Sequence, residues 1–128
     1  MKNILIVEDD PFTQDFYSFL LKRAGYNLTI LEDGDEIISK LQYDEFNLII
    51  MDYSLKNSSI NGTKINGMQL TRHIKNTISK HIPVLLITGF APDKKKDMFL
   101  EESLADEYML KPITDFNLFL DKIKRLIT

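Results

Sequence analysis

The chain has 128 residues, of which 44% are hydrophobic and 27% charged, values that suit one globular domain with its own core. The net charge of −3 excludes a broad basic surface for nucleic acid or an anionic membrane, and the absence of cysteine excludes disulfides and thiolate metal sites. No apolar run approaches the roughly 20 residues of a membrane span, and the short run before Glu8 is not a signal peptide. We therefore expect one cytoplasmic domain over residues 1–128.

Five short aliphatic runs predict strands, at residues 4–7, 28–31, 48–51, 84–87 and 108–110. Several of these runs are apolar at every position, which is typical of strands in a parallel sheet that is covered on both faces. Segments with helical spacing of apolar residues lie between the strands. This alternation predicts a doubly wound α/β domain with right-handed crossovers.

The first helix has clear start and stop signals. Asp10 is a good N-cap, Pro11 suits the first turn, and Gly25 lies where the helix is expected to stop. One face of this helix is predicted to enter the core, and its residues are Phe12, Phe16, Phe19 and Leu20.

Four further helices and one loop are predicted downstream. The expected inward residues are Ile37, Ile38 and Leu41 in the second helix, Leu70, Ile74 and Ile78 in the third, and Phe116, Phe119, Leu120, Ile123 and Ile127 in the last. The fourth helix, over 92–103, has the weakest pattern, and Thr114 is the expected cap of the last. The stretch "KNSSINGTKING", residues 56–67, is rich in Asn, Ser and Gly and predicts a long loop after the third strand.

Polar residues follow the ends of four predicted strands. They are Glu8, Asp9 and Asp10 after the first strand, Asp52 after the third, Thr88 after the fourth and Lys111 after the fifth. The carboxyl ends of parallel strands lie along one edge of the sheet, where ligands bind in open α/β folds. We therefore expect acids, a hydroxyl and an amine to converge there.

Such a set of groups has a chemical logic. Adjacent carboxylates repel one another unless a cation joins them, and they are the ligands that Mg²⁺ (or Mn²⁺) prefers. With the metal bound, a further carboxylate can attack phosphorus and form an aspartyl phosphate, while the hydroxyl and the amine hold the phosphoryl oxygens. The position of Asp10 before Pro11 favours capping over metal binding.

Four segments, "ILIVEDDP", "LIIMDYSL", "PVLLITG" and "YMLKPI", resemble in order the four motifs of the receiver domain of two-component response regulators. The resemblance covers nearly the whole chain and implies a flavodoxin-like (βα)5 fold with a five-stranded parallel sheet in the order 2-1-3-4-5. It implies that Asp52 is the phosphoacceptor and that Glu8 and Asp9 are the acidic pair, with Asp9 a direct metal ligand. It also implies that the backbone carbonyl of Ser54 binds the metal.

The same resemblance assigns the remaining motif residues. Thr88 is implied as the switch hydroxyl, Lys111 as the phosphate-binding amine, and Tyr108 as the aromatic switch that moves with Thr88. The peptide bond before Pro112 is implied to be cis.

The chain also departs from the family pattern. Lys56 stands where the family usually has a proline, and the glycine that opens the third helix is matched by Gly67, which implies an insertion beside the site. The small pair that usually precedes the last strand is replaced in "SLADEY". By resemblance, Ser54 and Phe90 flank the phosphate and tune its loss, which predicts slow self-dephosphorylation; the inserted loop is either a further lid or a passive surface loop.

We expect a signalling switch that takes a phosphoryl group from a sensor histidine kinase or a histidine phosphotransfer protein. Its expected output surface is formed by the fourth helix, the fifth strand and the fifth helix, without catalysis beyond its own phosphorylation and dephosphorylation, without DNA or membrane binding, and without an output segment in these residues. A haloacid-dehalogenase-like phosphatase is the alternative enzyme, but Glu8 holds its nucleophile position. A flavin binder would need a phosphate loop in place of the acids, and a phosphorylation-independent scaffold would not need the complete set.

Overall fold

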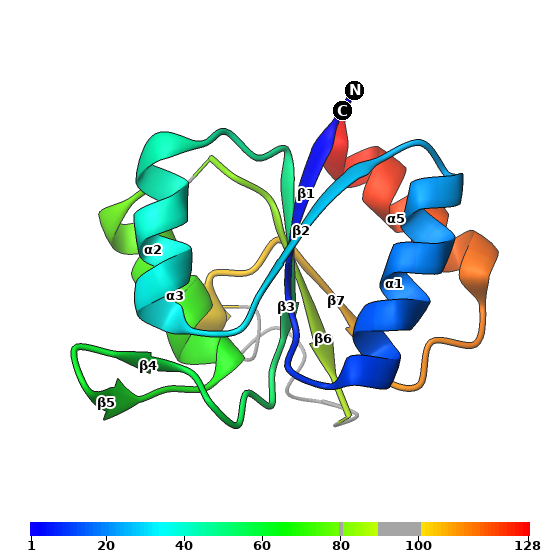
Figure 1. Cartoon of the computed structure of the whole chain (residues 1–128). Helices are drawn as coiled ribbons and strands as arrows, with labels where there is room; N and C mark the ends of the chain where they lie inside the picture. The colour runs from blue at the N-terminus through cyan, green and yellow to red at the C-terminus, as the bar shows by residue number, and fades with distance from the viewer. Residues whose placement is uncertain (80, 90–100) are drawn as a thin grey trace.

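The computed structural model describes residues 1–79, 81–89 and 101–128 (Figure 1). Its main sheet has five parallel strands in the order β2-β1-β3-β6-β7, which confirms the predicted doubly wound fold. The strands are β1 (Asn3–Val7), β2 (Asn27–Leu31), β3 (Leu48–Asp52), β6 (Val84–Thr88) and β7 (Glu107–Leu110).

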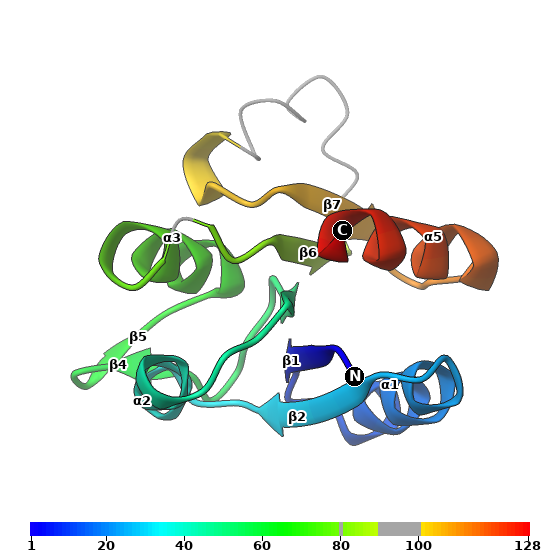
Figure 2. The same cartoon turned by 90° about the horizontal axis from the view of Figure 1, so that it is seen from above.

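Helices cover both faces of this sheet (Figures 1 and 2). On one face lie α1 (Pro11–Arg23) and α5 (Phe116–Ile127), and on the other lie α2 (Gly34–Tyr43) and α3 (Gly67–Thr77). In the part of the chain that is described, no helix is long and apolar enough to cross a membrane.

The sheet divides the core into two hydrophobic layers, and this explains why β1 has four consecutive apolar residues, Ile4–Val7. Ile4 and Ile6 pack in the layer under α1 and α5, whereas Leu5 and Val7 pack in the layer under α2 and α3. All four side chains are fully buried. Alternating side chains of a strand point to opposite faces, so a strand covered on both faces needs an apolar residue at each position.

The predicted inward face of α1 is wrong in part. Phe12 and Phe19 are 85% and 66% exposed, whereas Tyr17 and Leu21 are the fully buried residues of the helix. At about 100° per residue, Phe12 lies roughly 140° around the helix from Tyr17. The helix carries more apolar residues than one face holds, and packing on the sheet selects the face centred between Tyr17 and Leu21.

The ends of the helices follow local capping chemistry. Asp10 caps α1 as predicted, because its carboxylate accepts the backbone N–H of Thr13 at 2.9 Å. The predicted cap of the last helix is wrong by one residue, since Asp115, and not Thr114, accepts the N–H of Leu118 at 2.9 Å.

The inward faces of the other helices are largely as predicted. The buried apolar residues are Ile37 and Leu41 in α2, Leu70 and Ile74 in α3, and Phe119 and Ile123 in α5. Phe116 is an exception at 48% exposed, because it lies at the start of α5, where its ring meets the ring of Phe16 at 5.4 Å. The predicted fourth helix, over 92–103, lies mostly outside the described residues. Its last three residues, 101–103, are described and are helical.

The predicted long loop at 56–67 contains a small antiparallel hairpin instead (Figure 1). Its strands are β4 (Ser59–Ile60) and β5 (Thr63–Lys64), and the turn residues Asn61 and Gly62 have φ values of 51° and 82°. An Asn-Gly pair with positive φ at both positions makes the type of two-residue turn that suits a hairpin. The prediction of a long loop is therefore wrong for residues 59–64.

Candidate functional site

The carboxyl edge of the sheet gathers the polar residues that were predicted to converge. Asp52 ends β3 and Thr88 ends the neighbouring strand β6, and both side chains are buried. Just past β7, the backbone N–H of Lys111 donates to the carbonyl of Thr88 at 2.8 Å. Glu8 and Asp9 directly follow β1, the strand on the other side of β3.

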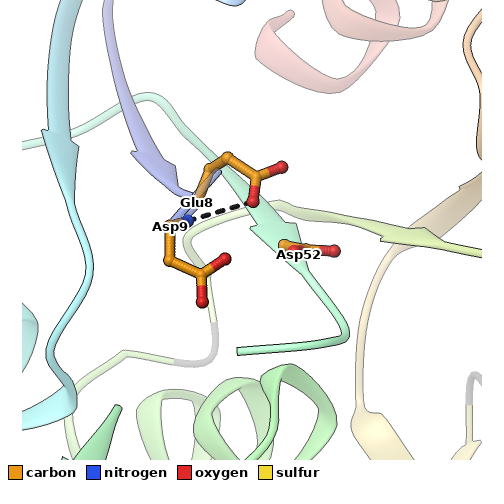
Figure 3. A group of neighbouring side chains, drawn as sticks. All are labelled: Glu8, Asp9 and Asp52. Carbon is orange, nitrogen blue, oxygen red and sulfur yellow. Dashed lines mark hydrogen bonds between the residues drawn. The ribbon is translucent and has the colours of Figure 1, made fainter. Parts of the chain in front are cut away.

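Three carboxylates form the centre of this site (Figure 3). Glu8, Asp9 and Asp52 each offer one oxygen, and these oxygens lie within 4.8 Å of one another. A hard divalent cation that keeps several waters fits a donor set of this kind, since it needs only a few carboxylate oxygens from the protein. The acidic residues Glu8 and Asp9, together with Asp52, thus form a donor set that suits a divalent cation.

Lys111 neutralises part of this negative charge. Its Nζ lies 2.8 Å from Oδ1 of Asp52 and 3.4 Å from Oε1 of Glu8. Burial lowers the pKa of Lys111, but the hydrogen bond and charge of Asp52 and the charge of Glu8 outweigh it, and the pKa is raised overall. The amine therefore stays charged beside the Asp52 carboxylate.

Glu8 is the most strongly perturbed acid of the site. Its side chain is 1% exposed, and Oε2 accepts the backbone N–H groups of Asp9 at 3.0 Å and Asp10 at 3.2 Å. Burial, together with the hydrogen bond and charge of Asp52, raises the pKa of Glu8 to about 7. Without a cation, the three carboxylates thus do not all carry a charge at neutral pH.

The two aspartates that follow Glu8 have different roles in the structure. Oδ2 of Asp9 accepts the backbone N–H of Lys56 at 2.6 Å, which joins the end of β1 to the segment after β3. Asp10 instead bonds the N–H and hydroxyl of Thr13, and these bonds lower its pKa. The interpretation of Asp10 as a helix cap is confirmed.

Other expected site residues vary in what the structure says of them. The Lys111–Pro112 peptide bond is cis, as expected. The N–H of Ser54 lies 3.4 Å from Oδ1 of Asp52, so Ser54 borders this carboxylate. Tyr108 is half-buried on β7 against the hydrophobic layer of α2 and α3. Phe90 lies outside the described residues.

Gly67 brings α3 against the backbone of Asp52. A side chain at this position would collide with the carbonyl oxygen of Asp52, and the Gly67 N–H donates to the carbonyl of Tyr53 at 2.8 Å. The glycine matched across the insertion therefore has a steric reason to be there.

Sequence reasoning missed two contacts with the site. The side-chain amide of Gln14 donates to the carbonyl of Glu8 at 2.6 Å, and the N–H of Lys56 donates to Asp9. Gln14 lies one helical turn after the Asp10 cap, and this spacing is a sequence signal that could have placed its side chain near the end of β1. The Lys56 contact uses the backbone N–H, so its residue-type signal is the absence at this position of the usual proline, which could not donate.

Fold and site together define a doubly wound α/β protein with an acidic site paired to a lysine at the carboxyl edge of its sheet. Within that class, the model of the response regulator receiver domain family matches residues 4–124, and the chain belongs to this family. It is a receiver domain of two-component signal transduction. Nothing in the comparisons favours the alternative of a phosphatase.

Curated relatives of the chain are signalling proteins. The chain is 31% identical over 119 residues to the response regulator ArlR of Staphylococcus haemolyticus, and 29% identical over 114 residues to the alkaline phosphatase synthesis transcriptional regulatory protein PhoP of Bacillus subtilis. These matches cover 93% and 88% of the chain but only 50% and 43% of the relatives. The CAI-1 autoinducer sensor kinase/phosphatase CqsS of Vibrio cholerae is 27% identical over 95% of the chain and 17% of its own length. The chain therefore spans half or less of these three relatives.

Solved structures agree over nearly the whole chain. A CheY-like receiver domain protein of Methanospirillum hungatei has a TM-score of 0.79 and 27% identity, and covers 99% of this chain and 94% of its own. The response regulator TrrA of Thermotoga maritima, solved in complex with Mg²⁺ and BeF, has a TM-score of 0.79 and 26% identity, with coverage of 98% and 99%.

Proposed function

We propose that this domain accepts a phosphoryl group on Asp52 in a Mg²⁺-dependent reaction. The observation that carries the proposal is the place of the Asp52 carboxylate, which joins the acid cluster to Lys111 at 2.8 Å. The proposed donor is the phosphohistidine of a sensor histidine kinase or of a histidine phosphotransfer protein. The similar response regulator TrrA was solved in complex with Mg²⁺ and BeF, and this supports a Mg²⁺-dependent reaction in this domain.

In this mechanism Glu8, Asp9, Asp52 and the backbone carbonyl of Ser54 hold the cation. When bound, Mg²⁺ offsets the repulsion between the carboxylates and the incoming phosphoryl oxygens. A carboxylate oxygen of Asp52 forms a bond to phosphorus while the phosphorus–nitrogen bond of the donor breaks, and the electron pair of that bond stays on the imidazole nitrogen. The phosphoryl group passes from donor to acceptor without change in its atoms.

Lys111 and Thr88 act on the product of this transfer. The Lys111 amine, which bonds Asp52 before the reaction, moves to a phosphoryl oxygen and keeps its charge beside the new negative charge. The Thr88 hydroxyl turns toward another phosphoryl oxygen, and Tyr108 on the adjacent strand follows. The output surface then includes β7, α5 and the segment that precedes β7.

A phosphorylation assay tests this assignment directly. Incubation with acetyl phosphate and Mg²⁺ should add the mass of one phosphoryl group to the protein, and Asp52→Asn should abolish the addition because an amide is a poor nucleophile. Asp44→Asn is a matched control, because Asp44 is an exposed acid that pairs with Lys40 at the far end of α2. Equal labelling of Asp52→Asn and the parent would overturn the assignment.

A further inference from the structure

The acid at the start of α2 does not cap its own helix. Asp33 occupies the N-cap position, but its carboxylate makes no capping hydrogen bond within α2. Oδ1 of Asp33 instead accepts the backbone N–H of Ser59 in β4 at 3.1 Å, with the Ser59 hydroxyl at 3.5 Å. Two residues further, the carboxylate of Asp35 accepts the N–H of Asn61 at 3.1 Å. Two acidic residues at the start of α2 therefore accept hydrogen bonds from the backbone of the hairpin.

The hairpin is packed tightly against this end of α2. A Cβ atom at Gly34 would lie 2.6 Å from the carbonyl oxygen of Ser59 and 3.0 Å from the side chain of Ile60, so only glycine allows the approach. Ile60 and Ile65 are half-buried against the hydrophobic layer under α2 and α3. In Figure 1 the hairpin lies beside the lower end of α2. These contacts describe a specific interface and not a passive loop.

The same segment is tied to the metal ligands at its other end. It leaves the site after Asp52, and the Gly67 N–H closes it by donating to the carbonyl of Tyr53 at 2.8 Å. Within it, the Lys56 N–H donates to Oδ2 of Asp9 at 2.6 Å, three residues before the backbone N–H that Asp33 holds. Asp9 and Asp33 thus accept hydrogen bonds from two backbone N–H groups that are three residues apart in the same segment.

We propose that Asp33 is a positioning residue for the metal site, and that it acts by docking the hairpin on α2 so that the Lys56 N–H stays fixed on Asp9. A carboxylate with one oxygen held by the backbone keeps its orientation. The side chain of Asp9 therefore loses its conformational entropy when the protein folds, and not when the metal binds. The inference rests on the proposed Mg²⁺ site at Glu8, Asp9 and Asp52. It assigns the insertion a role in metal affinity.

A pair of substitutions at one position separates this role from simple charge. Asp33→Ala and Asp33→Asn lose the same negative charge, but Asn keeps a side-chain oxygen that can accept the Ser59 N–H. We expect Asp33→Ala to weaken Mg²⁺ binding roughly threefold to tenfold relative to Asp33→Asn, measured by calorimetric titration of the unphosphorylated protein. Asp44→Ala, at the far end of α2, should bind Mg²⁺ as the parent does.

Hydrogen exchange gives a second readout that does not depend on affinity. Because coupling between two sites is reciprocal, Mg²⁺ should slow exchange of the Lys56 and Ser59 amides in the parent, and this protection should be lost in Asp33→Ala. If Asp33→Ala does not fold, as judged by circular dichroism, Asp35→Ala against Asp35→Asn makes the same comparison at the outer contact.

The outcomes distinguish the two proposals. Equal Mg²⁺ affinity of the Ala and Asn variants, or Mg²⁺-independent exchange of Ser59 in the parent, would overturn the positioning role while leaving the metal site intact. A parent protein that binds no Mg²⁺ would overturn the metal site and with it the role of Asp33.

Discussion

Glu8 combines a buried carboxyl group with two nearby acids, and this makes it the residue through which pH acts on the site. In the metal-free protein its pKa is raised from 4.5 to about 7 by burial and by Asp52. The folded chain therefore keeps the Glu8 proton at pH values where the unfolded chain has already released it. Since the folded state binds more protons between these two values, stability should fall as pH rises through this window.

A substitution at Glu8 tests this reasoning. Glu8→Gln removes the ionisation, so the loss of unfolding free energy between pH 5 and pH 8 should shrink by roughly 1–3 kcal/mol relative to the parent. The measurement is urea unfolding of both proteins in the presence of EDTA. Parallel stability profiles for the two proteins would show that Glu8 does not titrate in this range. Added Mg²⁺ should raise the stability of the parent most at pH 8, where Glu8 is ionised.

At the scale of elements, the connection into β7 contains a residue in an unfavourable conformation. Leu104 has a φ of 64°, in the left-handed region that side chains other than glycine rarely adopt. It follows the helical residues 101–103, where a glycine commonly ends a helix, and at 39% exposed it is not part of the buried core. The departure seen in "SLADEY" thus has a conformational cost.

Leu104→Gly should therefore stabilise the domain. Glycine relieves the left-handed strain of roughly 1 kcal/mol, against which the greater freedom of glycine in the unfolded chain sets a smaller loss. We expect a net gain of about 0.5 kcal/mol in unfolding free energy, measured by urea denaturation. Leu104→Ala is the matched control, since it removes the side chain but keeps the strain. A Gly variant no more stable than the Ala variant would contradict this account.

The elements also show which features a sequence reveals. The strands were predictable because β1, β3 and β6 are buried on both faces, and each carries four consecutive apolar residues. The inward face of α1 was not, because Phe12 and Phe19 look like core residues and only packing on the sheet sets the helix phase. The hairpin had a local signal in Asn61–Gly62, but its docking depends on Asp33, which is distant in sequence.

At the scale of the whole molecule, the site was predictable to the degree that residue type carries it. Glu8, Asp9, Asp52 and Lys111 lie at the carboxyl ends of β1, β3 and β7, so the parallel topology places all four along one edge of the sheet. The link from Asp9 to Lys56 was hard to predict because every residue except proline supplies a backbone N–H. The same limit applies to the positioning role proposed for Asp33, which depends on backbone donors.

The proposed signal output requires that a change at Asp52 on β3 reach β7, the strand at the edge of the sheet. Thr88 is fully buried at the end of β6, and β7 pairs with β6 in parallel, with Tyr108 beside Leu86. A Thr88 hydroxyl drawn toward a phosphoryl group leaves space that the Tyr108 ring can enter. Thr88 and Tyr108 thus lie on neighbouring strands, two positions apart in the register, and the proposed switch couples their movement.

Crystal structures with and without Mg²⁺ and beryllofluoride, a mimic of the phosphoryl group, test this coupling. We expect Thr88 to turn toward the beryllofluoride on Asp52 and Tyr108 to rotate inward. In Thr88→Ala the mimic should still bind, because Asp52, Lys111 and the acid pair remain, but Tyr108 should have no fixed inward orientation since the hydroxyl that commits the space is gone. A Tyr108 ring that keeps one rotamer in both parent structures would show that the signal leaves the site by another route, and an equal rotation in Thr88→Ala would show that Thr88 is not the link.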